Sequence, residues 1–378
     1  MVKKGLNMEE IKNRNIRSIL SYLRTYGPNS RKIIAEKLNL TTASLTNLTN
    51  ELIKSNLIIE LGEVNEGKVG RKQVLIDLNS NSKISLGLEV RNKKINFIAI
   101  DIKANVLESK EWEFENKINN QDFEKVLKYL ENYIKDKREK ILGIGILVPG
   151  FIENEISKNS DIKDIKKKVE AILKIPTFIE NNIRGLVEAE LYLEKKYNNF
   201  WLVSYGPGVG SAIVLNGKVL LGNKKKSGEI GHIPLTLSKK KRSCKICNQN
   251  GCLESEIHFD IIKKRLALDS IEKKQEESDI DFFKRVLKKD DYKELKENLD
   301  ILARYVSIGF SILDPEKLIL SGEIFSILEL YEFFISKIKF YNNLIKKDDI
   351  EHMEHYDYKR KIAAAILVLS DFFSIKDQ

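Results

Sequence analysis

Residues 41–54 read TTASLTNLTNELIK, and the fold of the N-terminal part of the chain follows from their pattern. Leu45, Leu48 and Leu52 recur at the spacing of one helix face and predict a buried stripe. Thr41 is of a type preferred immediately before a helix begins. The other faces of the first two turns carry small polar side chains, namely Thr42, Ser44, Thr46 and Asn47. The stretch therefore predicts a short helix with one apolar and one small, polar face.

Two more helices and a hairpin are predicted around this stretch. A helix over residues 8–26 ends at a Gly-Pro pair, and Ser30 can cap a second helix. Beyond the third helix, residues 57–61 and 73–78 read as two strands. Their glycine-rich connection carries three cations, Lys68, Arg71 and Lys72. These elements predict a winged helix-turn-helix.

The small polar face and the basic hairpin predict DNA binding. The first turns of a recognition helix reach base edges in the major groove, and cations on a wing suit phosphates beside the minor groove. Residues 1–82 hold 13 Lys and Arg against 8 Asp and Glu, so half of the net charge of +10 lies in this segment. The expected DNA contacts are Thr41, Thr42, Ser44, Thr46, Asn47, Lys68, Arg71 and Lys72. The alternative is a packing module, because helix-turn-helix shapes also serve that purpose.

The remaining chain alternates strands and helices. From Lys83 onward, apolar runs such as residues 141–148 and 200–205 are separated by helical stretches such as residues 121–137. This alternation is typical of an α/β domain. A length of 378 residues with 42% hydrophobic residues predicts two or three packed units in total.

No membrane segment or leader is predicted. No apolar run approaches the ~20 residues that span a bilayer. The first ten residues lack the apolar core of a signal peptide. We therefore expect a cytoplasmic protein without a membrane partner.

The three cysteines fall within one short segment, at positions 244, 247 and 252. This arrangement does not suit a secreted disulfide scaffold, and in a reducing compartment it reads first as a metal site. With His232 upstream, three thiolates and one imidazole would complete a tetrahedral shell for structural zinc. The alternative is three reduced cysteines and an unrelated histidine.

Four motifs in the α/β part make a family resemblance specific. They are Gly143-Ile144-Gly145-Ile146-Leu147-Val148-Pro149-Gly150, Glu180-Asn181-Asn182, Gly228-Glu229-Ile230-Gly231-His232 and Gly251-Cys252-Leu253-Glu254. They resemble motifs of the ROK family of repressors, open reading frames and kinases. Residues 16–78 resemble the winged helix of its xylose-repressor-type members, so the resemblance covers essentially the whole chain.

The resemblance implies an α/β fold in which a winged helix-turn-helix precedes a two-lobed, actin-like and ribonuclease-H-like sugar-kinase fold. Residues 1–82 would form the DNA-binding domain. Residues 83–184 would form the first lobe, on which a C-terminal helix within about residues 358–378 packs. Residues 185–357 would form the second lobe, with the zinc loop and the helices for dimerisation.

The resemblance also implies which residues bind a sugar between the lobes. By match to the family motifs they are Asn181, Glu229, His232 and Glu254, and His232 would also bind zinc with Cys244, Cys247 and Cys252. The zinc loop departs from the family pattern: Lys245 and Ile246 make a two-residue spacing where one residue is usual, and Asn248 replaces a glycine. The alternative is that the sugar-matched side chains only brace the zinc loop.

The residues for phosphoryl transfer differ from those of the family's kinases. Asn182 stands at the position of the catalytic aspartate, and a neutral amide cannot act as a carboxylate base. Glu89–Lys93 replaces a glycine-rich phosphate loop, Pro207 replaces a threonine in the second loop, and Gly322-Glu323 replaces a glycine pair. We therefore expect no enzyme activity. Asn182 joins the expected sugar-binding residues, since its amide can donate to a hydroxyl.

These features predict a sugar-responsive transcriptional regulator, a repressor of carbohydrate genes. A homodimer or higher homo-oligomer would bind a palindromic operator, with structural zinc as cofactor and a small sugar as effector. One alternative is a sugar kinase with a DNA-binding head, against which Asn182 speaks. The other is a dimerisation scaffold that binds no sugar.

Overall fold

The computed structural model describes residues 7–64, 73–91, 93–150, 152–153, 156–157, 162, 164–235, 243–244, 247–265, 271, 274, 279–287 and 292–374. The chain divides into two compact units. The first comprises Met1–Val148, Ser160–Glu180 and Lys361–Gln378, and the second comprises Pro149–Asn159 and Asn181–Arg360. Among the described helices, none combines the length and the apolar character that a bilayer crossing requires.

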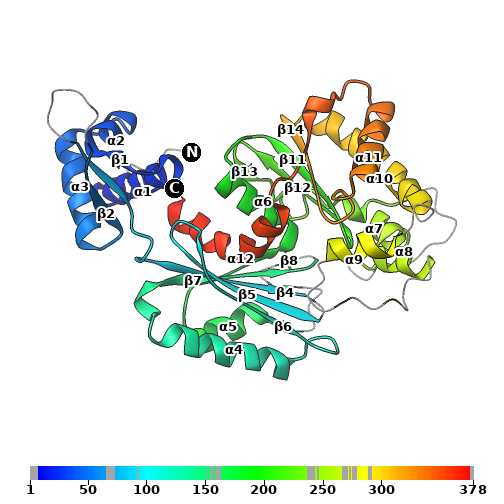
Figure 1. The fold of residues 1–378 in the computed structure, drawn as a ribbon, viewed down its shortest axis with the longest axis horizontal. Helices are drawn as coiled ribbons and strands as arrows, with labels where there is room; N and C mark the ends of the chain where they lie inside the picture. Colours follow the sequence, from blue (N-terminus) through cyan, green and yellow to red (C-terminus); the bar gives the residue numbers. More distant parts are fainter. Residues whose placement is uncertain are drawn as a thin grey trace. The chain divides into compact units, whose positions relative to one another are not determined.

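The first unit begins with the predicted winged helix-turn-helix (Figure 1). Its elements are α1 (Met8–Tyr26), β1 (Asn29–Ser30), α2 (Arg31–Lys37), α3 (Thr42–Lys54), β2 (Ile58–Val64) and β3 (Gln73–Leu78). The strands form a sheet in the order β1-β3-β2. The predicted caps are confirmed, since the hydroxyls of Ser30 and Thr41 accept backbone N–H groups of α2 and α3 at 3.4 and 3.1 Å. The two-residue strand β1 was not predicted, because so short a segment carries no periodic pattern.

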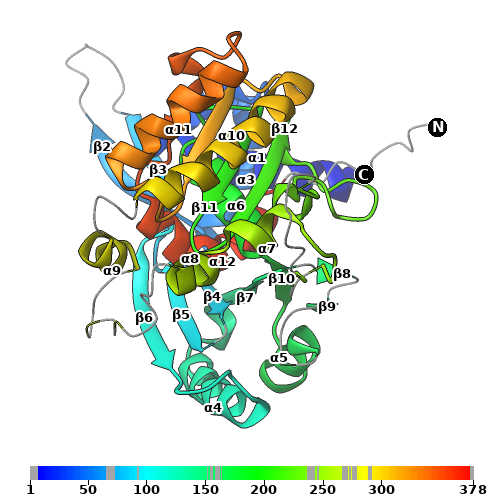
Figure 2. The ribbon, with the colours of Figure 1, turned by 90° about the vertical axis from the view of Figure 1, so that its right-hand side faces the viewer.

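The α/β part of the first unit is a five-stranded sheet in the order β10-β7-β4-β5-β6. Helices α4 and α5 cover one face and α12 covers the other (Figures 1 and 2). The elements are β4 (Ile84–Val90), β5 (Lys94–Asp101), β6 (Val106–Glu113), α4 (Asn120–Lys135), the 3-10 helix η1 (Arg138–Lys140), β7 (Ile141–Val148), α5 (Ile165–Leu173), β10 (Thr177–Asn181) and α12 (Tyr356–Phe373).

Helix α12 lies directly on the backbone of β4 and β7. A β-carbon added at Gly145 would lie 1.8 Å from the Ala364 carbonyl oxygen, and one added at Gly87 would lie 2.5 Å from the Ala365 nitrogen. Ser85 donates a hydrogen bond of 2.6 Å from its hydroxyl to the Ala365 carbonyl. Glycines on the strands and alanines on the helix therefore permit a contact that larger side chains would prevent.

The second unit is built on a sheet in the order β13-β12-β11-β14-β15. Side chains alternate along β11: Phe200 and Leu202 pack in the core that includes α6, whereas Trp201 and Val203 pack in the core that includes α10 and α11. The elements are β8 (Ile152–Glu153), β9 (Ile156–Ser157), α6 (Asn182–Leu193), β11 (Phe200–Tyr205), β12 (Val209–Leu215), β13 (Lys218–Val219), η2 (Ile230–His232), α7 (Leu253–Ile257), α8 (Phe259–Arg265), α9 (Asp279–Val286), α10 (Tyr292–Leu313), β14 (Lys317–Ser321), α11 (Leu328–Tyr341), η4 (Lys347–Asp349) and β15 (Ile350–His352).

Substituting Gly145 by alanine is expected to destabilise the protein, because the new methyl group would overlap the Ala364 carbonyl. Overpacking of this kind costs about 1–3 kcal/mol or more. Urea unfolding of Gly145→Ala measures the loss. The control is Ser109→Ala on the exposed face of β6, expected within about 0.5 kcal/mol of the parent. Equal stability of the two variants would show that α12 does not contact β7 closely.

Candidate functional site

The exposed face of α3 presents the small polar residues that the sequence predicts. Leu45, Leu48 and Leu52 are buried against the rest of the winged helix. Thr42, Thr46 and Asn47 are exposed, and Ser44 is half-buried. The Thr41 hydroxyl oxygen accepts the Ser44 N–H, so this residue shapes the start of the helix. The arrangement leaves short hydrogen-bonding groups uncovered over the first turns of α3.

The wing strands join α3 through Arg31. Its guanidinium donates to the Thr49 hydroxyl of α3 at 2.9 Å and forms an ion pair with Glu60 of β2 at 2.7 Å. The three predicted cations of the wing, Lys68, Arg71 and Lys72, lie outside the described residues.

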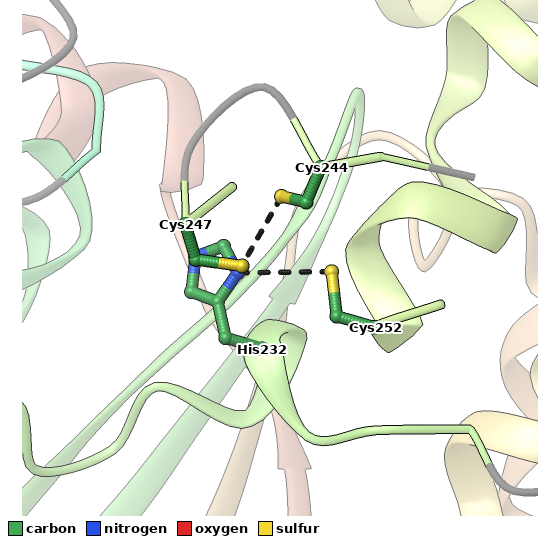
Figure 3. A group of neighbouring side chains, drawn as sticks. All are labelled: His232, Cys244, Cys247 and Cys252. Atoms are coloured by element: carbon green, nitrogen blue, oxygen red, sulfur yellow. Dashed lines mark hydrogen bonds between the residues drawn. The ribbon is translucent and has the colours of Figure 1, made fainter. Parts of the chain in front are cut away.

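A cluster of one histidine and three cysteines lies in the second unit (Figure 3). His232 ends the 3-10 helix η2, and Cys252 immediately precedes α7. The Nδ1 atom of His232 is 3.7 Å from the Cys244 Sγ and 3.9 Å from the Cys252 Sγ. All four candidate ligand atoms, including Cys247 Sγ, lie within 4.8 Å of one another.

The geometry of this cluster fits a tetrahedral metal ion. Bonds of roughly 2.0–2.3 Å to nitrogen and sulfur place neighbouring ligands of zinc about 3.5–3.8 Å apart. The observed contacts from His232 come close to these separations. His232 at the end of η2, Cys252 just before α7, and the two cysteines between these elements could therefore hold a metal.

Asn248, which stands where the family usually has a glycine, fits the backbone of the turn after Cys247. Its backbone adopts a left-handed conformation with φ of 59°, and its N–H donates to the Cys244 carbonyl at 3.0 Å. Asparagine tolerates this region better than most residues other than glycine. The departure at this position from the family glycine is therefore compatible with the turn.

The sugar-matched carboxylate of Glu229 lies close to His232 and to a buried arginine. His232, Glu229 and Glu254 interact electrostatically with one another. Arg184, which is 3% exposed, forms an ion pair of 3.3 Å with Glu229 and donates to the Lys225 carbonyl at 2.6 Å. The guanidinium therefore holds the Glu229 carboxylate in place at the start of η2.

Glu254 contacts the glycine-rich loop of residues 206–210, which is the second phosphate loop of the motif match. Its Oε2 accepts the Val209 N–H at 2.6 Å, and a β-carbon on Gly208 would lie 2.3 Å from its Oε1. Burial raises the pKa of this carboxyl to about 7, against the opposing effects of the Val209 N–H and of His232. Glu254 therefore supports the loop, as well as lying near His232.

Asn181 caps α6. Its Oδ1 accepts the Ile183 N–H at 2.8 Å, and its Nδ2 donates to the Gly150 carbonyl at 2.7 Å. Asn182 is the first residue of α6 and is half-buried. Within the described part of the chain, the side chain of Asn182 makes no hydrogen bond.

Two buried carboxylates lie in segments that the sequence resemblance matches to phosphate loops. Glu89 is buried in the first unit, where its oxygens pair with Arg91 at 2.7 Å and accept from Asn96 at 3.0 Å. Glu323 is 1% exposed in the second unit and pairs with Arg360 at 3.0 Å. A β-carbon on Gly206 would lie 2.4 Å from the Glu323 Oε2, so this carboxylate adjoins the second loop.

Sequence reasoning missed Arg184 and Arg360. Arg184 lies close to the buried residues Leu186 and Val187 of α6. An arginine on a buried helix face indicates an ion-pair or hydrogen-bond partner elsewhere in the chain. Its partner, Glu229, lies 45 residues away, so local patterns could not identify it.

Comparison with curated proteins identifies repressors as relatives. The xylose repressor of Bacillus spizizenii is 26% identical over 255 residues, which are 65% of this chain and 65% of that protein. The chain therefore matches less than two thirds of that repressor. The DNA-binding transcriptional dual regulator NagC of Escherichia coli is 25% identical over 342 residues, which are 84% of this chain and 82% of that protein.

Solved structures share the fold. A ROK-family transcriptional regulator, a homologue of the E. coli Mlc protein, has a TM-score of 0.73 at 21% identity and covers 96% of this chain and 97% of its own. The ROK hexokinase of Thermus thermophilus has a TM-score of 0.59 at 18% identity and covers 76% of this chain and 99% of its own. The model of the ROK family matches residues 85–370, well over half of the sequence. The chain therefore belongs to the ROK family.

Proposed function

We propose that the protein is a sugar-responsive DNA-binding repressor of carbohydrate genes. One observation carries the proposal: a winged helix with an uncovered, small polar face on α3 shares a chain with the ROK motif around Glu229 and His232. Repressors among the relatives support it. The proposed DNA contacts are Thr41, Thr42, Ser44, Thr46, Asn47, Lys68, Arg71 and Lys72. Its place would be the cytoplasm, with the DNA.

The proposed effector site lies in the second unit. Its residues are Asn181, Asn182, Glu229, His232 and Glu254. A carboxylate, an imidazole and amides can together donate to and accept from sugar hydroxyls. Because Asn181 and Glu254 already bond to the backbone, they would position the site as well as contact a sugar.

The proposed metal is one structural zinc ion on His232, Cys244, Cys247 and Cys252. With Nδ1 facing the sulfurs, the ring would keep Nε2 for a hydroxyl. Zinc would thereby hold together the loop that carries Glu229 and Glu254.

We also propose that the protein transfers no phosphoryl group. Asn182 cannot act as a carboxylate base. The side chains of Glu89–Lys93 replace the glycines of the family's first phosphate loop, and Glu323 replaces a glycine on the nucleotide side, so the backbone would allow phosphates a less close approach. The two carboxylates are each paired with arginine, which stabilises them where they are.

The proposed oligomer is a homodimer through α10 and α11. Apolar side chains project from the C-terminal halves of both helices: Ile308, Ile312 and Phe340 are 59%, 76% and 76% exposed. Asn342 donates to the Ser311 hydroxyl at 2.8 Å, so the two helix ends adjoin. A second copy would cover this apolar surface, and two-fold symmetry suits a palindromic operator.

The sugar response is expected to depend on Glu229. For the wild type, D-xylose or N-acetylglucosamine, the sugars in the relatives' names, should change operator affinity by roughly 5- to 150-fold. Glu229→Gln keeps an acceptor for Arg184 but removes the charge, so it should abolish the sugar response and leave sugar-free DNA binding intact. Anisotropy titrations on a genomic fragment selected by the protein, with and without sugar, measure both.

The control for this experiment is Glu297→Gln on α10, expected to respond as the wild type does. An ATP assay on the same preparation should show no sugar phosphorylation. If neither sugar changes the DNA affinity or gives heat in calorimetry, the effector model is wrong for these sugars. Preference for no genomic fragment over random DNA would remove the repressor proposal.

Metal analysis of protein purified without chelator is expected to find one zinc per chain. Cys247→Ser should lose the metal and unfold at lower temperature, by about 2–4 °C per kcal/mol lost for a unit of this size. Ser243→Ala, next to a ligand but not one itself, is the control and should keep the metal. Protein that is free of zinc yet as stable as the zinc-loaded form would contradict the assignment.

A further inference from the structure

Helix α12 begins in the second unit and ends in the first, because the boundary between the units falls at Arg360 and Lys361. Its first turn is held by ion pairs. Lys359 is 1% exposed and lies 2.7 Å from Glu190 and 2.9 Å from Glu194. Both carboxylates belong to the C-terminal end of α6 or follow it directly. The start of α6 is capped by Asn181, so one helix connects the proposed sugar site to Lys359.

The last turn of α12 contacts the DNA-binding module (Figure 1). Arg17 of α1 donates to the Ser374 carbonyl at 2.7 Å, and the Arg24 guanidinium lies 5.3 Å from the centre of the Phe373 ring. Two cations thus meet the carbonyl end of α12, where the helix dipole favours positive charge. These contacts belong to the first unit.

A second contact attaches the winged helix to the first unit. Lys103, in the turn after β5, pairs with the buried Asp77 of β3 at 2.5 Å. This contact involves neither α6 nor α12. Of these two attachments, only the one made by Arg17 and Arg24 is joined to the proposed sugar site by a helix.

The pair between Lys359 and Glu190 is buried, and stability alone does not explain a buried ion pair at this position. Well-packed apolar side chains stabilise such a position as well as a buried ion pair does, whereas a buried pair restricts how two helices can fit together. Lys359 is therefore suited to fixing one orientation of α12 against α6.

We propose that α12 transmits the sugar response, with Lys359 and Arg17 as positioning residues that connect α6 to the DNA-binding helices. The inference rests on the proposed function for its physiological meaning. A shift of α6 on sugar binding would move the first turn of α12, and the intact helix would pass the shift to α1. Coupling between two sites requires such an element with two arrangements.

The first test is the ratio of operator affinities with and without D-xylose or N-acetylglucosamine. Arg17→Ala and Lys359→Met should bring a wild-type ratio of roughly 5- to 150-fold below about twofold, while the calorimetric heat of sugar binding is kept. Arg17→Lys, which retains the charge and one donor, should restore part of the ratio. Arg14→Ala, which removes an exposed cation of the same helix without removing the Arg17 contact, is the control and should leave the ratio unchanged.

The second test needs neither sugar nor operator. Hydrogen exchange should be several-fold faster at amides of α1 in Lys359→Met than in the wild type, although position 359 does not belong to the first unit. Lys361→Met changes an exposed residue of the same helix and should leave hydrogen exchange in α1 unchanged. Arg17→Ala should speed exchange in the last turn of α12.

The outcomes separate the two proposals. A sugar-dependent ratio that persists in Arg17→Ala would overturn the role of α12 and leave the repressor proposal standing. Exchange that accelerates only around Lys359, with α1 unaffected, would also overturn it. If the wild type shows no sugar-dependent ratio, the proposed function fails with these sugars, and the exchange experiment alone decides whether α12 connects α6 to α1.

Discussion

The direct packing of α12 on the glycines of β4 and β7 is the contact on which the first unit depends. It joins Ser85 to Ala365 across 280 residues of chain. One face of the sheet therefore stays uncovered during folding until α12 packs on it. Long-range contacts of this kind slow folding, because the ends of a long loop must meet before the contact stabilises anything. The contact requires small residues both on the strands, where Gly87 and Gly145 lie, and on the helix, where Ala364 and Ala365 lie.

Local structure was largely predictable from the sequence, because its causes are local. The caps at Ser30 and Thr41 and the leucine stripe of α3 follow from residue type and spacing. The grouping of His232 with the three cysteines was predictable from the chemistry of these ligands, and the fold brings them together. The family was predictable from the motifs around positions 143, 180, 228 and 251.

The partners of the buried charged groups were not predictable. Arg184 meets Glu229, and Glu254 meets the Val209 N–H, each across 45 residues. Arg17 meets a carbonyl 357 residues away. Such pairings depend on how elements pack and leave no periodic trace in the sequence. The motif match also could not show that Asn181 and Glu254 have structural roles in addition to the sugar contacts expected of them.

The two contacts of Arg31 fix how α3 and β2 are oriented relative to each other, which would affect how the protein binds DNA. One guanidinium holds α3, the proposed recognition helix, through Thr49 and the strand β2 through Glu60. The two surfaces are thereby oriented before any duplex arrives, so little conformational entropy is lost when they dock. If this protein surface keeps its shape on binding, the DNA duplex has to deform to fit it. Sequence preference could then arise in part from base steps that bend easily, at positions that no side chain touches.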